Sequence, residues 1–139
     1  MVISPYYKDV ADMMQRGAEA VAAEAQATLD RVFVPGAFEI PAAIAHAAKT
    51  GGYDGYLALG CVVRGETSHY DYVCGESARG LMELSIREGL AIGYGILTVN
   101  TLAQAEERAD PKRGDKGGES ARAALAMIAL KRRFAETAR

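Results

Sequence analysis

The stretch LGCVVRGETSHYDYVCG, from Leu59 to Gly75, decides the fold of this chain. It begins inside the apolar run 56–63, which is short and bounded by turn signals, as is typical of a strand buried on both faces. Arg64 and Gly65 end that run, and the apolar residues that follow His69 recur with the period of a helix. The stretch therefore predicts a buried strand that passes through a glycine-containing loop into a helix.

The loop after this strand predicts a binding site for an anion. Thr67 or Ser68 supplies the hydroxyl expected to cap the helix, and Asp71 lies in its first turn. Unpaired backbone N–H groups and the positive end of the helix dipole meet at such a helix start, and together they bind phosphate. His69 lies at the mouth of this site. A glycine loop alone usually marks only a turn, and a histidine here is more often a surface residue, so a functional interpretation requires that other loops converge.

Strands alternate with helices in the rest of the chain. The apolar pattern predicts strands at 1–4, 31–34, 56–63 and 91–99. It predicts helices from 8 to about 26, over 41–49, from 69 to about 88, over 101–108, and after a polar loop at 110–118. The helix over 101–108 starts with Thr101 and Gln104 in the form of a capping box. The fold class predicted from this alternation is α/β, a three-layer α/β/α sandwich whose doubly wound, four-stranded parallel sheet has helices on both faces.

The carboxyl ends of the strands predict where a ligand binds, because ligands of parallel sheets bind just beyond those ends. The residues there are Tyr6-Tyr7, Ala37–Glu39, Arg64–His69 and Asn100-Thr101. The first three groups combine aromatic rings, a carboxylate, a histidine and the anion loop. They predict one pocket for a phosphorylated small molecule whose chemistry requires proton transfer. Tyr94 lies inside a predicted strand, so we do not expect it to reach the pocket of its own chain.

Composition limits the possible classes of protein. A chain of 139 residues predicts a single domain over 1–139. No apolar run approaches membrane-spanning length and the start lacks the pattern of a signal peptide, so we expect a soluble, cytoplasmic protein. A net charge of −2 argues against nucleic acid as a partner. Cys61 and Cys74 lack the spacing of a redox pair, and with two histidines in all no metal site is predicted.

Two charged features have alternative explanations at this stage. Glu39 lies on the opening turn of a helix, where its carboxylate can serve the helix dipole as well as a ligand. Basic residues at Arg108, Lys112, Arg113 and Lys116 gather around the polar loop and could bind an anion. The basic run 131–133, by contrast, is best explained as the solvated end of the last helix.

The chain resembles the lumazine synthase family. The resemblance covers residues 5–134 and depends on four motifs: VPGAFEIP at Val34–Pro41, GCVVRGETSHYDYV at Gly60–Val73, GILT at Gly95–Thr98, and QAEER with GDKGGE between Gln104 and Glu119. It implies a flavodoxin-like fold and the condensation of 5-amino-6-(D-ribitylamino)uracil with 3,4-dihydroxy-2-butanone 4-phosphate to 6,7-dimethyl-8-ribityllumazine, the penultimate step of riboflavin biosynthesis. It implies no metal and no organic cofactor.

The resemblance also implies roles for single residues. His69 corresponds to the family's proton-transfer histidine. The phosphate is expected at a loop and an arginine that correspond to Gly65, Glu66, Thr67 and Arg108, with Lys116 and Glu119 as polar residues near it. The pyrimidine and its ribityl chain are expected to contact Tyr6, Ala37, Phe38, Glu39, Cys61, Val62 and Val63.

In the family the pocket lies between neighbouring subunits of a homopentamer. The resemblance thus implies that Tyr94, Arg108 and Lys116 come from the second subunit. Some members stop at pentamers, whereas others pair them or close shells of sixty subunits. The compact loop 110–117 resembles that of shell-forming members, and the short segment before Pro5 favours simple pentamers.

The chain departs from the usual family pattern at three places, of which the short segment before Pro5 is one, and two functions other than synthase activity stay open. Pro5-Tyr6-Tyr7 stands where Arg-Phe-Asn is usual, and Tyr94 stands where phenylalanine is more frequent. The alternatives are a non-catalytic flavin or lumazine binder and a shell-forming structural protein. Retention of His69, Arg108 and Glu39 together argues against the binder, which requires neither a proton shuttle nor a phosphate clamp.

Overall fold

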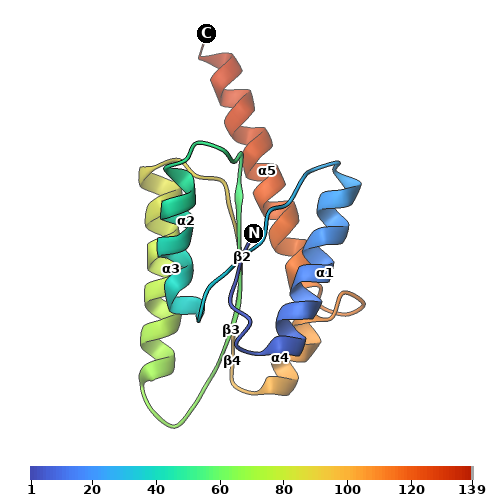
Figure 1. Ribbon diagram of the computed structural model, residues 1–139, viewed down its shortest axis with the longest axis vertical. Coiled ribbons are helices and arrows are strands. Elements are labelled where there is room, and N and C mark those ends of the chain that lie inside the picture. The colour runs from blue at the N-terminus through green and yellow to red at the C-terminus, as the bar shows by residue number, and fades with distance from the viewer. Residues whose placement is uncertain (139) are drawn as a thin grey trace.

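One parallel β-sheet holds every strand in residues 1–138, the part of the chain that the computed structural model describes (Figure 1). Its strands are β1 (Val2–Ile3), β2 (Val32–Phe33), β3 (Tyr56–Val63) and β4 (Ile92–Val99). They lie in the order β2-β1-β3-β4, and each neighbouring pair is parallel. The predicted four-stranded parallel sheet is therefore confirmed, and β3 agrees with its predicted bounds.

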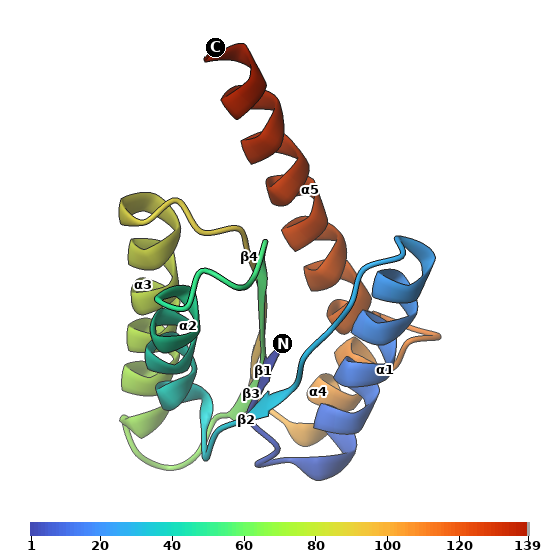
Figure 2. The same ribbon diagram turned by 45° about the horizontal axis from the view of Figure 1, so that its top comes forward.

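Helices cover both faces of the sheet, which confirms the doubly wound, three-layer, flavodoxin-like arrangement. They are α1 (Lys8–Glu24), α2 (Ile40–Ala48), α3 (His69–Arg87), α4 (Leu102–Ala109) and α5 (Lys116–Thr137), and a short 3₁₀ turn, η1 (Ala37–Glu39), precedes α2. Figure 2 shows α1, α4 and α5 on one face and α2 with α3 on the other. Within residues 1–138, no helix combines the length and the apolar character needed to cross a membrane.

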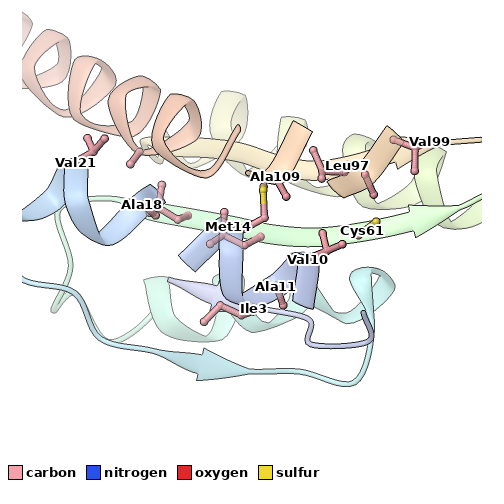
Figure 3. Packing of buried hydrophobic residues seen from close by; sticks show 14 of the residues in the cluster. Ile3, Val10, Ala11, Met14, Ala18, Val21, Cys61, Leu97, Val99 and Ala109 are labelled. Carbon is pink, nitrogen blue, oxygen red and sulfur yellow. The ribbon is translucent and has the colours of Figure 1, made fainter. Parts of the chain in front are cut away.

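The two faces of the sheet build two hydrophobic cores because side chains of a strand alternate between its faces. Ile3 and Leu59 point into the core beneath α1, α4 and α5, where Met14 fills the centre (Figure 3). Ala58 and its same-face neighbours pack against Ile40 on the α2 and α3 side. The central strand β3 is buried on both faces, as its continuous apolar run predicts.

Glycines let helix α5 approach the sheet and α1 more closely than other residues would. A Cβ atom on Gly93 of β4 would lie 2.1 Å from the carbonyl oxygen of Ser120, and one on Gly117 would lie 2.0 Å from that of Met14. Both contacts are with backbone atoms, which cannot move aside as a flexible side chain can. Glycine is therefore required wherever α5 crosses its neighbours.

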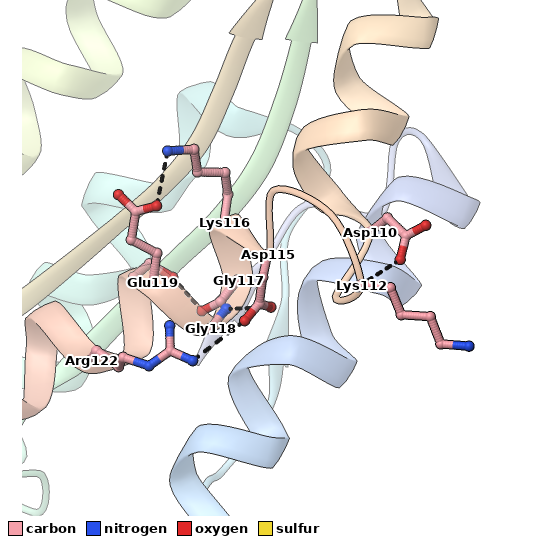
Figure 4. Close-up of polar contacts among 9 residues, drawn as sticks. Asp110, Lys112, Asp115, Lys116, Gly117, Gly118, Glu119 and Arg122 are labelled. Atoms are coloured by element: carbon pink, nitrogen blue, oxygen red, sulfur yellow. Dashed lines mark hydrogen bonds and ion pairs between the residues drawn. The ribbon is translucent and has the colours of Figure 1, made fainter.

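The start of α5 differs from the sequence-based prediction. Residues 110–118 were expected to form a polar loop, but α5 begins at Lys116 and includes both Gly117 and Gly118. The carboxylate of Asp115 accepts a hydrogen bond from the backbone N–H of Gly118 at 3.3 Å and so caps the helix (Figure 4). The glycines therefore indicate close packing against α1 here rather than a loop.

Replacing Gly117 by alanine is expected to destabilise the fold strongly. Its methyl group would overlap the Met14 carbonyl, and overpacking of this kind costs on the order of 3 kcal/mol in the free energy of unfolding. The measurement is urea denaturation at fixed protein concentration. Gly75→Ala in α3 is the matched control, because open space surrounds that position and alanine favours a helix by about 1 kcal/mol. A Gly117→Ala protein as stable as the wild type would refute the close-packing explanation.

Candidate active site

A cleft of about 590 Å³ lies at the carboxyl end of the sheet. This volume is in the range of sites for small molecules. The three predicted groups of residues converge on it: Tyr6 and Tyr7, Ala37–Glu39, and residues from β3 and the following loop, namely Cys61, Val62, Val63, Gly65, Thr67 and His69. Sequence analysis did not single out the remaining lining residues, which are Ser4, Pro35, Gly36, Tyr70 and Val73.

Aromatic side chains line one end of the cleft and are open to solvent. Tyr6 and Phe38 are both largely exposed, and the ring of Tyr6 meets that of Tyr7 edge to face at 5.1 Å between centroids. Glu39 is exposed between η1 and α2, and its carboxylate makes no capping hydrogen bond to α2. This end thus offers flat apolar surfaces and one carboxylate, which suits a planar ring that bears a polar chain.

The other end of the cleft is the loop that joins β3 to α3. Within residues 1–138, the backbone N–H groups of 65–68 donate no hydrogen bond to the protein. Ser68 stands at the N-cap of α3 but its hydroxyl makes no capping bond, whereas Thr67 Oγ1 accepts a hydrogen bond from the N–H of His69 at 3.3 Å. Neither predicted cap therefore makes a capping bond within α3, and Thr67 instead closes a turn just before the helix. Free N–H groups at a helix start are a binding site for anions.

Arg64 links this loop to the turn between β4 and α4, a role that sequence analysis missed. Its Nε donates to Asn100 Oδ1 at 2.9 Å, and its guanidinium lies 4.2 Å from the centre of the Tyr70 ring. Its Nη1 is 3.7 Å from Asp71 Oδ1. Because Tyr70 and Asp71 directly follow His69, this arginine holds the first turn of α3 in place from outside the cleft.

The turn that Arg64 contacts is itself fixed by the predicted capping box, which the structure confirms. Thr101 Oγ1 accepts a hydrogen bond from the N–H of Gln104 at 3.2 Å, and Gln104 Oε1 accepts from the N–H groups of Asn100 and Thr101 at 2.8 and 3.3 Å. Arg108 Nη1 donates to the carbonyl of Gln104 at 3.3 Å. A continuous set of hydrogen bonds thus joins the anion loop to the helix that bears Arg108.

Five of the predicted site residues do not line the cleft of their own chain. Glu66 belongs to the anion loop but is not among the residues that line the cleft, and the other four are Tyr94, Arg108, Lys116 and Glu119. Tyr94 is 47% exposed on β4, and Lys116 Nζ pairs with Glu119 Oε2 at 2.9 Å on the first turn of α5 (Figure 4). The basic residues predicted to gather in a loop are instead spread over α4, a short turn and α5.

The two cysteines are protonated thiols at neutral pH. Burial raises the pKa of Cys61, which lines the cleft, to about 11, and burial also raises the pKa of Cys74. A neutral thiol is a poor nucleophile, so neither residue is placed for covalent catalysis. Among residues 1–138, no three His, Cys, Asp or Glu side chains are grouped so that they could hold a metal ion.

The family model and the relatives that match this chain all carry the description of one family. A family model described as 6,7-dimethyl-8-ribityllumazine synthase matches residues 1–132. The chain is 53% identical over 134 residues to 6,7-dimethyl-8-ribityllumazine synthase of Novosphingobium aromaticivorans, with 96% of each chain covered. It is 56% identical over 139 residues to 6,7-dimethyl-8-ribityllumazine synthase 1 of Rhizobium meliloti, covering 96% of this chain and 91% of the relative. The Bartonella tribocorum protein named 6,7-dimethyl-8-ribityllumazine synthase is 50% identical, covering 98% of this chain and 91% of the relative.

Alkylation of Cys61 is expected to accelerate with pH far beyond the range of an ordinary thiol. Because the pKa is raised to about 11, the thiolate fraction keeps growing about tenfold per pH unit from pH 8 to pH 10. The measurement is the rate of iodoacetamide labelling in a Cys74→Ser background, so that only Cys61 reports, with the urea-unfolded protein as reference. A labelling rate that levels off near pH 9 in the folded protein would contradict the raised pKa.

Proposed function

The chain belongs to the 6,7-dimethyl-8-ribityllumazine synthase family, and we propose that its cleft carries the reaction of that family with His69 as the proton-transfer group. The enzyme is a transferase of riboflavin biosynthesis. It condenses 5-amino-6-(D-ribitylamino)uracil with 3,4-dihydroxy-2-butanone 4-phosphate and gives 6,7-dimethyl-8-ribityllumazine, phosphate and water. The observation that supports this placement most directly is the position of His69, which follows the free N–H groups of 65–68 in the same cleft.

The reaction requires position and proton transfer from the protein rather than a protein nucleophile. An amine of the pyrimidine attacks the ketone and forms an imine, phosphate leaves from the carbon chain, and the second amine closes the ring. Each step moves a proton to or from nitrogen or oxygen, and a histidine beside the phosphate can accept and return it. Beyond proton transfer, most of the rate enhancement comes from holding the two substrates side by side.

The two ends of the cleft suit the two substrates. We place the phosphate of the ketone at the backbone N–H groups of Gly65, Glu66 and Thr67, so that Glu66 contributes through its backbone although it is not among the residues that line the cleft. We place the pyrimidine along Cys61–Val63 and Ala37, with Tyr6 and Phe38 against the ring and Glu39 at the ribityl hydroxyls. His69 then stands between the reacting carbons and the phosphate.

We further propose that the active unit is a homopentamer whose cleft is completed by a neighbouring subunit. Tyr94, Arg108 and Lys116 lie outside the cleft of their own chain, and each has an exposed or half-exposed side chain. Large apolar side chains are exposed along the same chain, among them Phe33, Tyr72, Met82 and Ile86. In this proposal a neighbour covers them and receives Arg108 and Lys116 at its phosphate end, with Glu119 beside Lys116.

We propose that the protein is a single domain over residues 1–139 and acts in the cytoplasm.

Pentamers are the smallest assembly in which each proposed cleft is complete, and pairs of pentamers or shells of sixty subunits would repeat the same contact. Light scattering of the purified protein measures the mass in solution. A monomer that forms product at full rate would contradict the shared cleft.

Product formation tests the proposed activity. Absorbance on mixing purified protein with both substrates should show lumazine formation above the uncatalysed background. His69→Ala is expected to lower kcat roughly 100-fold or more, because general acid–base catalysis typically contributes that much, with little change in pyrimidine binding. His46→Ala is the matched control, since His46 lies on α2 outside the cleft. Unchanged kcat in His69→Ala would remove the proton-transfer role.

Arg108→Ala is expected to raise the KM for the phosphorylated ketone about 10- to 100-fold, as loss of a charged hydrogen bond does, with a smaller effect on the KM for the pyrimidine. Steady-state kinetics with each substrate varied in turn provide the measurement. Arg113→Ala removes a nearby arginine that pairs with Glu107 at 3.6 Å and should leave both KM values unchanged. An effect of Arg108→Ala confined to the pyrimidine would refute its assignment to the phosphate.

A further inference from the structure

Ser4 is a buried polar residue whose side chain has no partner. It is 3% exposed, and within residues 1–138 its Oγ is the one buried side-chain oxygen or nitrogen that makes no hydrogen bond to the protein. Buried hydroxyl groups are nearly always hydrogen-bonded, because leaving one unpaired destabilises a fold. The hydroxyl therefore requires an explanation outside the packing of the chain itself.

The position of Ser4 restricts what could bind its hydroxyl. Ser4 directly follows β1 and lines the cleft, and its backbone N–H donates to the carbonyl of Leu59 at 2.9 Å. A Cβ atom built on Gly60 would lie 3.7 Å from the Cβ of Ser4, 3.6 Å from that of Ala37 and 3.2 Å from Ile40 Cδ1. Ser4 and Ala37 therefore both lie close to Gly60 of β3. Because no group in residues 1–138 partners the Ser4 hydroxyl and Ser4 lines the cleft, a molecule bound in the cleft can supply the partner.

We propose that Ser4 is a substrate-binding residue whose hydroxyl hydrogen-bonds to the polar edge of the pyrimidine. The inference depends on the proposed function and deepens it. Ser4 and Ala37 both approach Gly60, which places Ser4 at the end of the cleft assigned to the ring, whereas the phosphate is assigned to the start of α3. A hydroxyl both donates and accepts, which suits an edge that presents N–H and C=O groups together.

This role predicts that removal of the Ser4 hydroxyl lowers the affinity for the substrate without lowering the stability of the fold. In the substrate-free protein the unpaired hydroxyl contributes nothing to the fold, so its removal leaves stability unchanged or improves it. In the complex the same removal loses one neutral hydrogen bond. A residue that served only the fold would show the reverse pattern, with lower stability and unaltered kinetics.

The test is Ser4→Ala, with steady-state kinetics and thermal unfolding measured on the same preparation. We expect the KM for the pyrimidine to rise roughly 3- to 10-fold, the usual worth of one neutral hydrogen bond, while kcat and the KM for the phosphorylated ketone stay within about twofold. We expect a Tm equal to or above that of the wild type. Fluorescence titration with 6,7-dimethyl-8-ribityllumazine should show a matching loss of affinity.

The controls distinguish failure of this inference from failure of the proposed function. Wild-type protein that forms no product would count against the function, whereas wild-type turnover with an unchanged pyrimidine KM in Ser4→Ala would overturn the inference alone. A lower Tm in Ser4→Ala would also overturn it, because the hydroxyl would then be satisfied in the free protein, for example by a bound water. Ser77→Ala removes a buried hydroxyl outside the cleft, one that donates to the carbonyl of Cys74, and should leave both KM values unchanged.

Discussion

The burial of β3 between two helical layers is the constraint on which the rest of the structure depends. Both faces of this strand are covered, so its register is fixed by side chains of two separate cores. The carboxyl end of β3 leads directly to Gly65, Thr67 and His69, which all line the cleft. The loop that joins β3 to α3 is too short to move far. His69 is exposed, yet it stands on the first turn of a helix that is anchored to a rigid strand.

Polar contacts around the loop connect it to Arg108, which lies outside the cleft of its own chain. Arg64 ties the loop to Asn100, and Gln104 ties Asn100 to Arg108, so a single hydrogen-bonded chain runs from the cleft to a side chain outside it. In the proposed pentamer the two ends of this chain serve different clefts. The geometry of each cleft then depends on that of the next, which gives the assembly a catalytic as well as a structural purpose.

The sequence predicted those features that depend on local pattern. The buried run 56–63, the capping box at Thr101 and the alternation of strands and helices depend on periodicity and on short-range hydrogen bonds, and all three are confirmed. The predicted start of α5 was wrong because Gly117 is required by the backbone of α1, which is distant in the sequence. For the same reason the contacts of Arg64 and the unpaired hydroxyl of Ser4 could not be predicted: they depend on what folding brings beside them.

The most direct test of the account is whether one cleft draws its residues from two chains. His69→Ala and Arg108→Ala subunits, each inactive or weak alone, should be co-expressed in equal amounts and their mixed assembly checked by native mass spectrometry. If each cleft takes His69 from one subunit and Arg108 from the next, about one quarter of the clefts regain both residues. Activity should then recover to about that fraction of the wild type, measured at saturating pyrimidine and at a ketone concentration well below its wild-type KM, where Arg108→Ala clefts contribute little. Mixed assemblies with no more activity than the average of the two separate variants would contradict the shared cleft and place both residues in the site of a single chain.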